Sequence, residues 1–223
     1  MDYLTPAELA IFARVPVRGQ VKTRLEPVLG VEGAYAAHLE LVQDCLGRLA
    51  HVSGLVTTLW LDGPPNALAQ DWSDRFGVAL AIQPTGDLGD RMQAALARAL
   101  SRGRAGLVVG TDCPTIDAAY VRRAIECLAQ HDLVFAPAED GGYGLVGLAA
   151  SSQSILSGLF ANVRWSTAQA LSDTLANVLA GRAQDGSTPV MCSRIALLPT
   201  IWDVDQPDDW LRYAALRQQR IGH

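Results

Sequence analysis

The feature of this sequence that most restricts its fold is a regular alternation of strand-like and helix-like segments along 223 residues. Short apolar runs alternate with longer segments in which apolar residues recur every three or four positions. The predicted strands cover residues 9–13, 55–61, 78–82, 106–110, 133–137, 143–148 and about 191–198. This alternation predicts a three-layer α/β/α sandwich built on a mostly parallel, mixed sheet.

The segments between these strands predict the helical layers. The expected helices cover residues 34–49, 67–76, about 92–100, 117–129, 154–160, 167–180 and a last segment that begins near 208. Residues 143–148 follow the preceding strand too closely for a helical crossover, so an antiparallel strand is expected there. A polar loop is expected from Gly181 to Pro189. No inter-domain linker stands out, and we therefore predict a single domain over residues 1–223.

Charge and cysteine usage limit the partners of the chain. The net charge of −5 argues against a strongly basic surface for nucleic acid. The four cysteines form no CxxC pair, which argues against a zinc site; Cys45 and Cys127 fall on apolar helix faces, where buried thiols are expected. The first residues lack the basic region of a signal peptide, and no apolar run is long enough for a membrane span. We expect a cytoplasmic protein; a homodimer is compatible with the sequence, which does not specify the oligomeric state.

A basic loop follows the first predicted strand. It runs from Ala13 through Gly19 to Leu25, and its four cations are Arg14, Arg18, Lys22 and Arg24. Gly19 lets the backbone turn and approach a ligand closely. Lys and Arg side chains together with backbone amides suit a polyphosphate. The alternative is a solvated basic loop, and the glycine spacing excludes a Walker-type loop.

A glycine-rich junction precedes the helix near residue 92. Gly86 and Gly89 could admit the edge of a nucleobase or ribose against bare backbone, with Asp90 beside them. The simpler interpretation is that Asp87 or Asp90 caps the helix and that the glycines serve an ordinary turn.

The segment GTDCP places Asp112 directly after the most apolar strand of the chain. In open α/β sheets, ligands bind beyond the carboxyl ends of the strands. Mg²⁺ prefers oxygen ligands and often takes one or two carboxylates together with substrate phosphates. We therefore interpret Asp112 as a metal ligand. Asp112 could instead cap the next helix, but Thr115 or Asp117 is better placed for that role.

Two further acidic segments follow predicted strands. In the first, Asp140 is a candidate general base, and an acceptor could contact the residues around it: Glu139, Gly141, Gly142 and Tyr143. The alternative there is a hairpin that needs an Asp-Gly turn.

The second acidic segment lies before the last helix. Asp205 and Asp208 could cap that helix, with Pro207 at its start, or Asp203 or Asp205 could supply a second metal carboxylate.

Two single residues complete the set of candidates. Trp165 could line an acceptor pocket, with Ser166 beside it as a helix cap. His38 lies on a helix stripe, where a packed histidine is expected.

Several of these segments together resemble a known family. In chain order they are ARVPVRGQVKTRL, GDLGDRM, VVGTDCP, PAEDGGYGLVGL, RWST and DVDQPDD. They are similar to the DUF2064 or "transferase 1, rSAM/selenodomain-associated" group, the arsenosugar-biosynthesis-type glycosyltransferases. That group belongs to the nucleotide-diphospho-sugar transferase (GT-A) superfamily and is related to the 2-phospho-lactate guanylyltransferases and, more remotely, to molybdenum-cofactor nucleotidyltransferases. The resemblance covers nearly the whole chain.

The resemblance implies a GT-A fold with a nucleotide bound across the first strands. Asp112 takes the position of the metal-binding aspartate, and Lys22 matches the phosphate-contacting lysine of nucleotidyltransferase relatives. Asp205 matches, loosely, the second metal ligand. The chain departs from the family pattern in having TDC in place of D-x-D, and Asp205-Gln206-Pro207 in place of Asp-Thr-Pro. The first departure leaves the donor open.

The expected activity is transfer from a nucleotide-activated donor to a small-molecule acceptor, with Mg²⁺ or Mn²⁺ as cofactor. Glycosyl transfer from a nucleotide-diphospho-sugar is the first expectation; guanylyltransferase-like nucleotidyl transfer from a nucleoside triphosphate, with release of pyrophosphate, is the alternative. A non-catalytic nucleotide-binding protein is a rival from another class. A Rossmann dehydrogenase is disfavoured because no GxGxxG follows the first strand.

Overall fold

The computed structural model describes residues 6–180 and 194–221, and a seven-stranded sheet forms its centre. The strand order is β3-β2-β1-β4-β6-β5-β7. The strands are β1 (Ala7–Ala13), β2 (Leu55–Leu61), β3 (Ala79–Ile82), β4 (Ala105–Gly110), β5 (Leu133–Pro137), β6 (Tyr143–Leu148) and β7 (Ile195–Leu197). β6 runs antiparallel to both of its neighbours, and the other pairs are parallel. The mixed sheet, including the antiparallel strand at 143–148, confirms the prediction.

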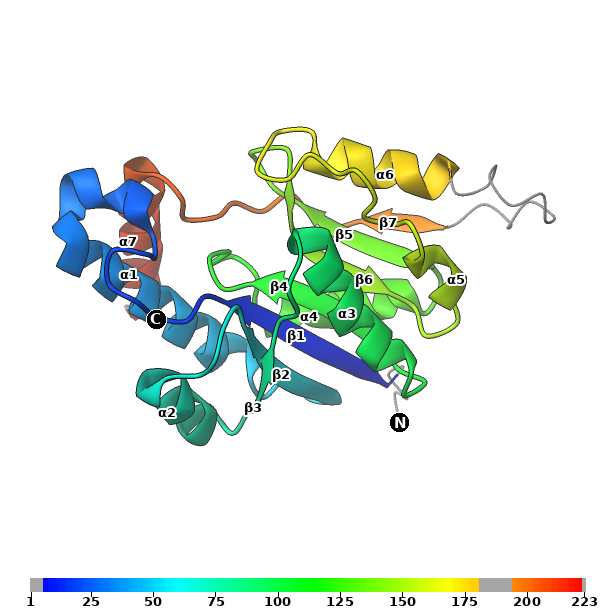
Figure 1. Ribbon diagram of the computed structural model, residues 1–223, viewed down its shortest axis with the longest axis horizontal. Helices are drawn as coiled ribbons and strands as arrows, with labels where there is room; N and C mark the ends of the chain where they lie inside the picture. The colour runs from blue at the N-terminus through cyan, green and yellow to red at the C-terminus, as the bar shows by residue number, and fades with distance from the viewer. Residues whose placement is uncertain (1–5, 181–193, 222–223) are drawn as a thin grey trace.

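Helices cover both faces of the sheet, because the strands are apolar on both sides. One face packs against α1 (Glu26–Leu49), α2 (Ala67–Phe76) and α4 (Ala118–Leu128). The other packs against α3 (Leu88–Leu100), α5 (Gln153–Leu156) and α6 (Ala170–Ala180). The result is the three-layer α/β/α sandwich that the alternation predicts (Figure 1).

The last helix, α7 (Pro207–Ile221), lies beside α1 at one end of the molecule (Figure 1). A separate apolar cluster joins these helices to the short 3-10 helix η1 (Thr23–Leu25); it includes Leu25, Leu41, Trp202 and Tyr213. The strands other than β6 point towards this end of the molecule. The C-terminal segment is therefore packed against the loop that follows β1.

Three local expectations need correction. The helix expected over 154–160 is only the four residues of α5. Ser166 does not cap a helix: it has φ +60°, and α6 begins at Ala170. The last strand is the three residues Ile195–Leu197, while residues 191–193 and the polar loop expected over Gly181–Pro189 lie outside the described residues.

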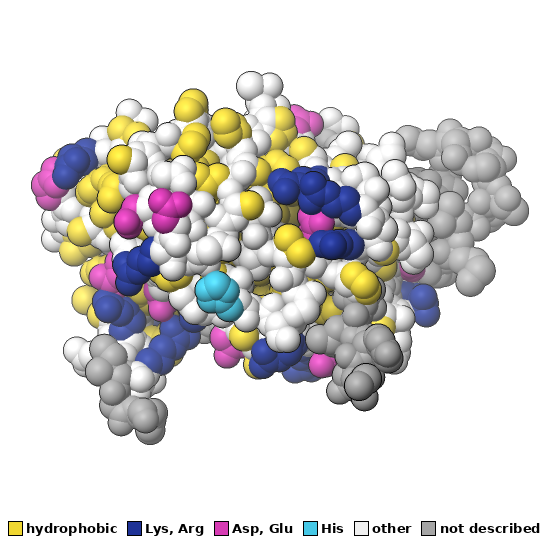
Figure 2. All heavy atoms as spheres, turned by 90° about the horizontal axis from the view of Figure 1, so that it is seen from below, with side chains coloured by type: hydrophobic (Ala, Val, Ile, Leu, Met, Phe, Trp, Pro, Cys, Tyr) yellow, Lys and Arg dark blue, Asp and Glu magenta, His cyan; other side chains and the backbone are white. Residues whose placement is uncertain are grey.

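The surface matches the balanced composition. Figure 2, which looks at the molecule from below, shows basic and acidic side chains interspersed with apolar ones on that face. Among the described helices, none combines the length and hydropathy that crossing a bilayer requires.

Candidate functional site

The site forms where β1 and β4 end next to each other. The chain passes from β1 to β2 and β3 on one side, while β4 lies on the other side of β1. Such a reversal of strand order opens a crevice at the carboxyl ends of the strands, where ligands of α/β proteins bind. The loop after β1 carries Lys22, and the turn after β4 carries Asp112.

Lys22 and Asp112 meet across this crevice. Lys22 Nζ lies 2.9 Å from Asp112 Oδ2, and it also donates to the carbonyl of Val204 at 2.6 Å. Lys22 adopts the left-handed conformation (φ +48°), which turns the chain into η1. Its side chain is only 13% exposed, against 36% for that of Asp112. The pair therefore joins three distant segments at the sheet edge.

The environment keeps Asp112 ionised. Desolvation raises the pKa of this carboxyl, but the charge and hydrogen bond of Lys22 outweigh it and bring the pKa below its ordinary value. The alternative role as a helix cap is excluded, because the Asp117 carboxylate caps α4 by accepting from the Tyr120 amide at 2.8 Å. The Asp112 carboxylate is thus left for a ligand.

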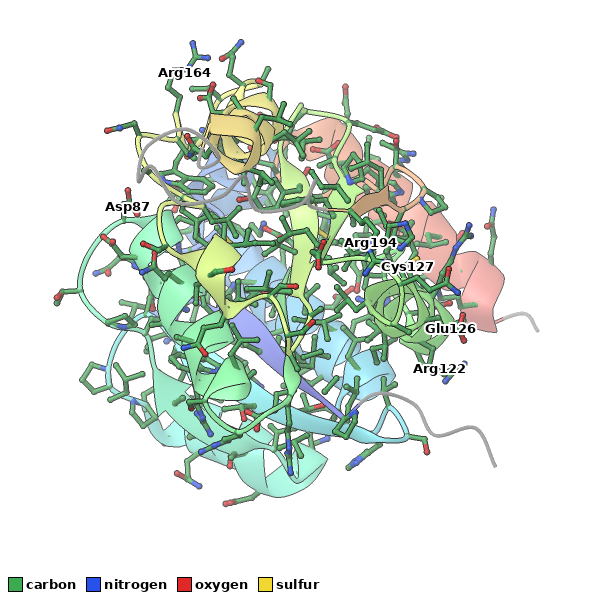
Figure 3. The ribbon with its side chains drawn as sticks, turned by 90° about the vertical axis from the view of Figure 1, so that its right-hand side faces the viewer. Asp87, Arg122, Glu126, Cys127, Arg164 and Arg194 are labelled. Carbon is green, nitrogen blue, oxygen red and sulfur yellow. The ribbon has the colours of Figure 1, made fainter. Side chains whose placement is uncertain are left out.

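The neighbouring thiol has no sign of activation. Cys113 is buried, and desolvation, together with the charge of Asp112, holds its pKa well above the ordinary value. Cys45 is buried too, and its pKa is raised to about 12 by the same desolvation. Cys127 lies in the last turn of α4, at the opposite end of that helix from its N-cap Asp117 (Figure 3). None of these thiols suits a nucleophile.

Asp203, rather than Asp205, lies in the electrostatic neighbourhood of Asp112. Asp205 forms an ion pair with Arg24, so its carboxylate is already engaged. Burial raises the pKa of Asp203 to about 6, and the charges of Asp112 and Asp140 push it in the same direction. The ion pair with Arg24 favours Asp203 over Asp205 as the second metal ligand, and this assignment stays a prediction. Capping of α7 falls to Asp209, which accepts from the amides of Asp205 and Gln206.

The raised pKa of Asp203 predicts an effect of pH on stability in EDTA. The folded chain holds this proton up to about pH 6, whereas the ordinary pKa is 3.8. The contribution of Asp203 to the free energy of unfolding should therefore fall as pH rises from about 4 to 6 and level off above. Asp203→Asn should remove about 1–2 kcal/mol of that fall after solvent screening.

Urea unfolding at several pH values measures this difference. The comparison with the parent protein cancels groups such as His38, whose pKa burial lowers to about 4. Asp208→Asn, an exposed site on α7, is the matched control and should keep the parent slope. Equal slopes in the parent and Asp203→Asn would contradict the assigned environment.

The four cations of the basic loop have different partners and do not all point to the crevice. Arg14 donates to the carbonyl of Gln20 at 3.2 Å, and Gly19 takes φ +71° with open space around it. Arg18 is turned to the side: it pairs with Glu32 at 3.0 Å and stacks on Tyr35. Arg24 faces Asp205. Only Lys22 reaches the crevice between β1 and β4.

Two contacts besides those of the cations hold this loop. His38 is 4% exposed, as expected of a packed histidine, and its Nε2 donates to the carbonyl of Arg14 at 3.1 Å. Ala13, the last residue of β1, uses its carbonyl to accept from the Asp62 amide at 3.2 Å. The support from His38 was not predicted, because the sequence does not show that its helix packs against this loop.

The glycine-rich junction at 86–90 has the simpler of its two interpretations. Asp87 and Asp90 form a reciprocal capping box at the start of α3, at 2.9 and 3.0 Å (Figure 3). Gly86 has φ +127°, and Gly89 lies where a Cβ would come within 2.7 Å of Phe160. The structure thus gives Asp90 and both glycines structural roles, and a nucleotide contact at Gly86 or Gly89 stays a prediction.

The acidic turn between β5 and β6 contributes to a cavity. Asp140 Oδ1 accepts from the Gly142 amide at 2.9 Å, and Glu139 pairs with Arg212 at 2.8 Å. The carbonyl of Gly141 accepts from the Leu171 amide at 3.2 Å, which ties this turn to α6.

The two aromatic candidates lie in the apolar layer behind the turn. Tyr143 and Trp165 stack edge to face, with ring centroids 6.3 Å apart. The Tyr143 hydroxyl lies 3.3 Å from Thr174 Oγ1, and burial raises its pKa above the ordinary value. Neither aromatic residue lines the cavity described next. Their contact with an acceptor stays a prediction.

The cavity has a volume of about 310 Å³, at the lower end of the range for small-molecule sites. Its lining includes five carboxylates and a single arginine: Glu139, Asp140, Asp203, Asp205, Asp209 and Arg24. Ser166, Thr167 and Trp202 also line it and were missed as site residues. Trp202 directly precedes the acidic segment in the sequence. That position was the one signal that could have identified it as a site residue.

The donor set fits a divalent cation only with help from a ligand. Among residues 6–180 and 194–221, no three metal-ligating side chains come together. The charge of Asp112 contributes to the raised pKa of Asp203, and both side chains carry carboxylate oxygens. Mg²⁺ commonly takes one or two carboxylates and completes its coordination with water and substrate phosphates. The arrangement suits a cation that arrives with a nucleotide.

Solved structures share this architecture. A protein from Desulfovibrio desulfuricans G20, provisionally assigned as a nucleotide-diphospho-sugar transferase, is 26% identical over 91% of this chain and 83% of its own, with a TM-score of 0.76. A 4-diphosphocytidyl-2C-methyl-D-erythritol synthase from Anaerococcus prevotii DSM 20548 is 9% identical over 96% of each chain (TM-score 0.63). A CMP:2-keto-3-deoxy-manno-octonic acid synthetase complexed with CTP is 13% identical over 97% of this chain and 100% of its own (TM-score 0.60). The last two establish a likeness of fold alone.

These likenesses identify the three-layer sandwich as a GT-A-type fold. No curated protein matches the chain significantly. The bacterial family described as "Uncharacterized protein conserved in bacteria (DUF2064)" matches residues 45–167, more than half of the sequence, and this stretch includes Asp112 and the acidic turn at 139–142. The chain belongs to the DUF2064 family.

Proposed function

We propose that this protein is a divalent-metal-dependent transferase that uses a nucleotide-activated donor, with glycosyl transfer from a nucleotide-diphospho-sugar as its reaction. The observation that carries the proposal is the contact between Lys22 and Asp112 at the strand-order reversal between β1 and β4. A cation and a carboxylate at that point suit a phosphate ligand and the metal ion that accompanies it. One catalytic domain over residues 1–223 is part of this proposal.

In this proposal each residue of the crevice has a defined task. Lys22 contacts the donor phosphates, while Asp112 and Asp203 would hold Mg²⁺ or Mn²⁺. When bound, the metal ion would neutralise charge that develops on the leaving phosphate. Asp140, on the wall of the adjoining cavity, is the candidate base for an acceptor hydroxyl.

Nucleotidyl transfer is the second candidate, and the position of Arg24 favours it. Arg24 lies two residues beyond Lys22 and lines the adjoining cavity, where it pairs with Asp205; its side chain is 61% exposed. Two cations along one edge suit the longer anion of a nucleoside triphosphate. The two reactions release different products, a nucleoside diphosphate in the first and pyrophosphate in the second.

A thermal-shift panel tests the proposal. Nucleoside triphosphates and nucleotide sugars are added with and without Mg²⁺, and a specific ligand raises the melting temperature by mass action. We expect a metal-dependent rise with one nucleotide class, followed by product analysis for diphosphate or pyrophosphate. A flat response to both panels would overturn the proposal, whereas binding without any turnover would support the non-catalytic rival.

Lys22→Ala should weaken donor binding by about 30- to 1,000-fold. The ammonium is mostly buried, so its bond to a phosphate would be charge-assisted and little screened, worth about 2–4 kcal/mol. The measurement is a nucleotide titration in Mg²⁺ by calorimetry.

Arg18→Ala is the matched control from the same loop. Because Arg18 pairs with Glu32 at the surface, its loss should change affinity less than about threefold. Equal losses in both variants would show that the whole loop, and not Lys22, contacts the donor.

A further inference from the structure

The cavity beside the crevice is built by three segments that hold one another through backbone hydrogen bonds. The Glu139 amide donates to the carbonyl of Ile201 at 3.0 Å, and the Val204 amide donates to that of Asp112 at 2.9 Å. The third wall is the segment from Ser166 to Ala168. It is attached to α6 because Arg164, just before it, pairs with Asp173 of α6 at 2.8 Å. A cavity tied in this way is preformed, so its lining can be used to infer what it holds.

The charges of the lining disfavour an anion. Glu139 is paired with Arg212, and Asp205 with the one arginine of the lining, Arg24. Within the described chain, Asp140 has no cationic partner. A divalent cation at Asp112 and Asp203 would neutralise those two carboxylates but not the negative charge of Asp140. A phosphate monoester, with nearly two negative charges, would meet like charge there.

The helix N-termini beside this cavity also disfavour an anion. Helix N-termini bind phosphate through free amide groups, and α6 and α7 both begin beside the lining. At α7, the Asp209 carboxylate already accepts from two of these amides. At α6, Gln169 donates to Thr167 Oγ1, Ala170 to the carbonyl of Thr167, and Leu171 to that of Gly141. The two acidic side chains in the first turn of α7, Asp208 and Asp209, and the occupied amides at the start of α6 therefore disfavour a phosphate at this cavity.

We propose that this cavity binds the acceptor and that the acceptor is a small hydroxylated molecule without a phosphate group. This inference rests on the proposed function. The lining oxygens of Asp140 and Ser166 can accept hydrogen bonds from hydroxyl groups, and an amino group on the acceptor would bind more tightly still.

The inference selects glycosyl transfer over transfer of a nucleotide to a phosphate. The acceptor oxygen forms a bond to the anomeric carbon of the donor sugar. The bond from that carbon to the phosphate oxygen breaks, and the nucleoside diphosphate leaves with the electron pair. The hydroxyl proton passes to the Asp140 carboxylate, so atoms and charges balance.

Matched pairs of small molecules test the acceptor class. The protein is first saturated with Mg²⁺ and the nucleoside diphosphate of the donor that the thermal-shift panel identifies, which tests the proposed function by itself. Glucose is then compared with glucose 6-phosphate, and ethanolamine with phosphoethanolamine, by calorimetry. We expect the phosphorylated member of each pair to bind roughly tenfold more weakly, from repulsion at a few ångströms.

Two variants assign the difference to one side chain. Asp140→Asn keeps the oxygen that accepts from the Gly142 amide. It should reduce the difference in affinity within each pair to about twofold. Asp208→Asn removes the same charge from an exposed position outside the lining and should leave this difference unchanged. Three outcomes would overturn the inference. They are tighter binding of the phosphorylated members, a difference in affinity that Asp140→Asn does not change, and binding of no member at all. Failure of the first step alone would instead count against the donor site.

Discussion

Replacing Asp112 with asparagine should abolish the response of donor binding to Mg²⁺ and lower transfer by about 100- to 1,000-fold. An amide matches the carboxylate in size but is uncharged, so it holds a divalent cation poorly. It also deprives the Lys22 ammonium of its ionic partner, at 2.9 Å in the parent protein. Preorganised charge at a leaving phosphate commonly contributes about 3–4 kcal/mol to catalysis, which sets the expected scale. The measurement is a Mg²⁺ titration of the nucleotide-induced thermal shift, followed by transfer rates.

The control for Asp112 stands five residues further along the chain. Asp117 caps α4, and asparagine caps helices as well as aspartate does. Asp117→Asn should therefore leave both stability and the Mg²⁺ response near those of the parent. If Asp112→Asn retained the full Mg²⁺ response, the metal ion would have to bind elsewhere, and the assignment of Asp112 would fail.

The elements that the sequence predicted best are those in which local pattern and tertiary packing agree. Strand β2 and helix α2 have the predicted bounds, and strand β6 also has the predicted direction. In α2, Asn66 caps the start and Gly77 takes φ +61° at the end, so strong local signals coincide with a packed apolar face. Consistency across levels of this kind makes sequence patterns reliable.

The region from 154 to 169 was less predictable because its form depends on distant partners. Its apolar residues Leu159 and Phe160 are buried against α3 without continuing helix α5. The start of α6 is set by the backbone bond from Leu171 to Gly141, about thirty residues away. The spacing of the apolar residues correctly indicated that this segment is buried. It could not show that turns, and not a helix, bring these residues into the core.

The residues of the candidate site also differ in how far the sequence could predict their roles. Asp112 could be singled out because it directly follows a buried strand, which places it at the ligand-binding edge of the sheet. The choice between Asp203 and Asp205 depended on Arg24, which lies 181 residues earlier and pairs with Asp205. Arg18 was predicted to bind phosphate together with Lys22, and its contacts with Glu32 and Tyr35 could not be read from the sequence.

The largest effect on stability should come from Gly141→Ala. Gly141 has φ +87°, and a Cβ there would lie 2.3 Å from the carbonyl oxygen of Ala168. The left-handed conformation costs alanine about 1–2 kcal/mol, and the clash with fixed backbone adds about 1–3 kcal/mol. The melting temperature should fall by roughly 5–15 °C, as measured by calorimetry.

Gly158→Ala separates the two causes of that loss. Gly158 has φ +80°, but a Cβ there would meet no atom within 4 Å, so only the conformational cost applies. Its melting temperature should fall by roughly 3–6 °C. The excess loss in Gly141→Ala then measures how firmly the turn at 139–142 is pressed against the segment at 166–168. Because these segments form two walls of the acidic cavity, the same variant should also lose the preference for unphosphorylated acceptors. Equal losses in the two variants would mean that the walls yield easily, and the argument from a preformed cavity would then fail.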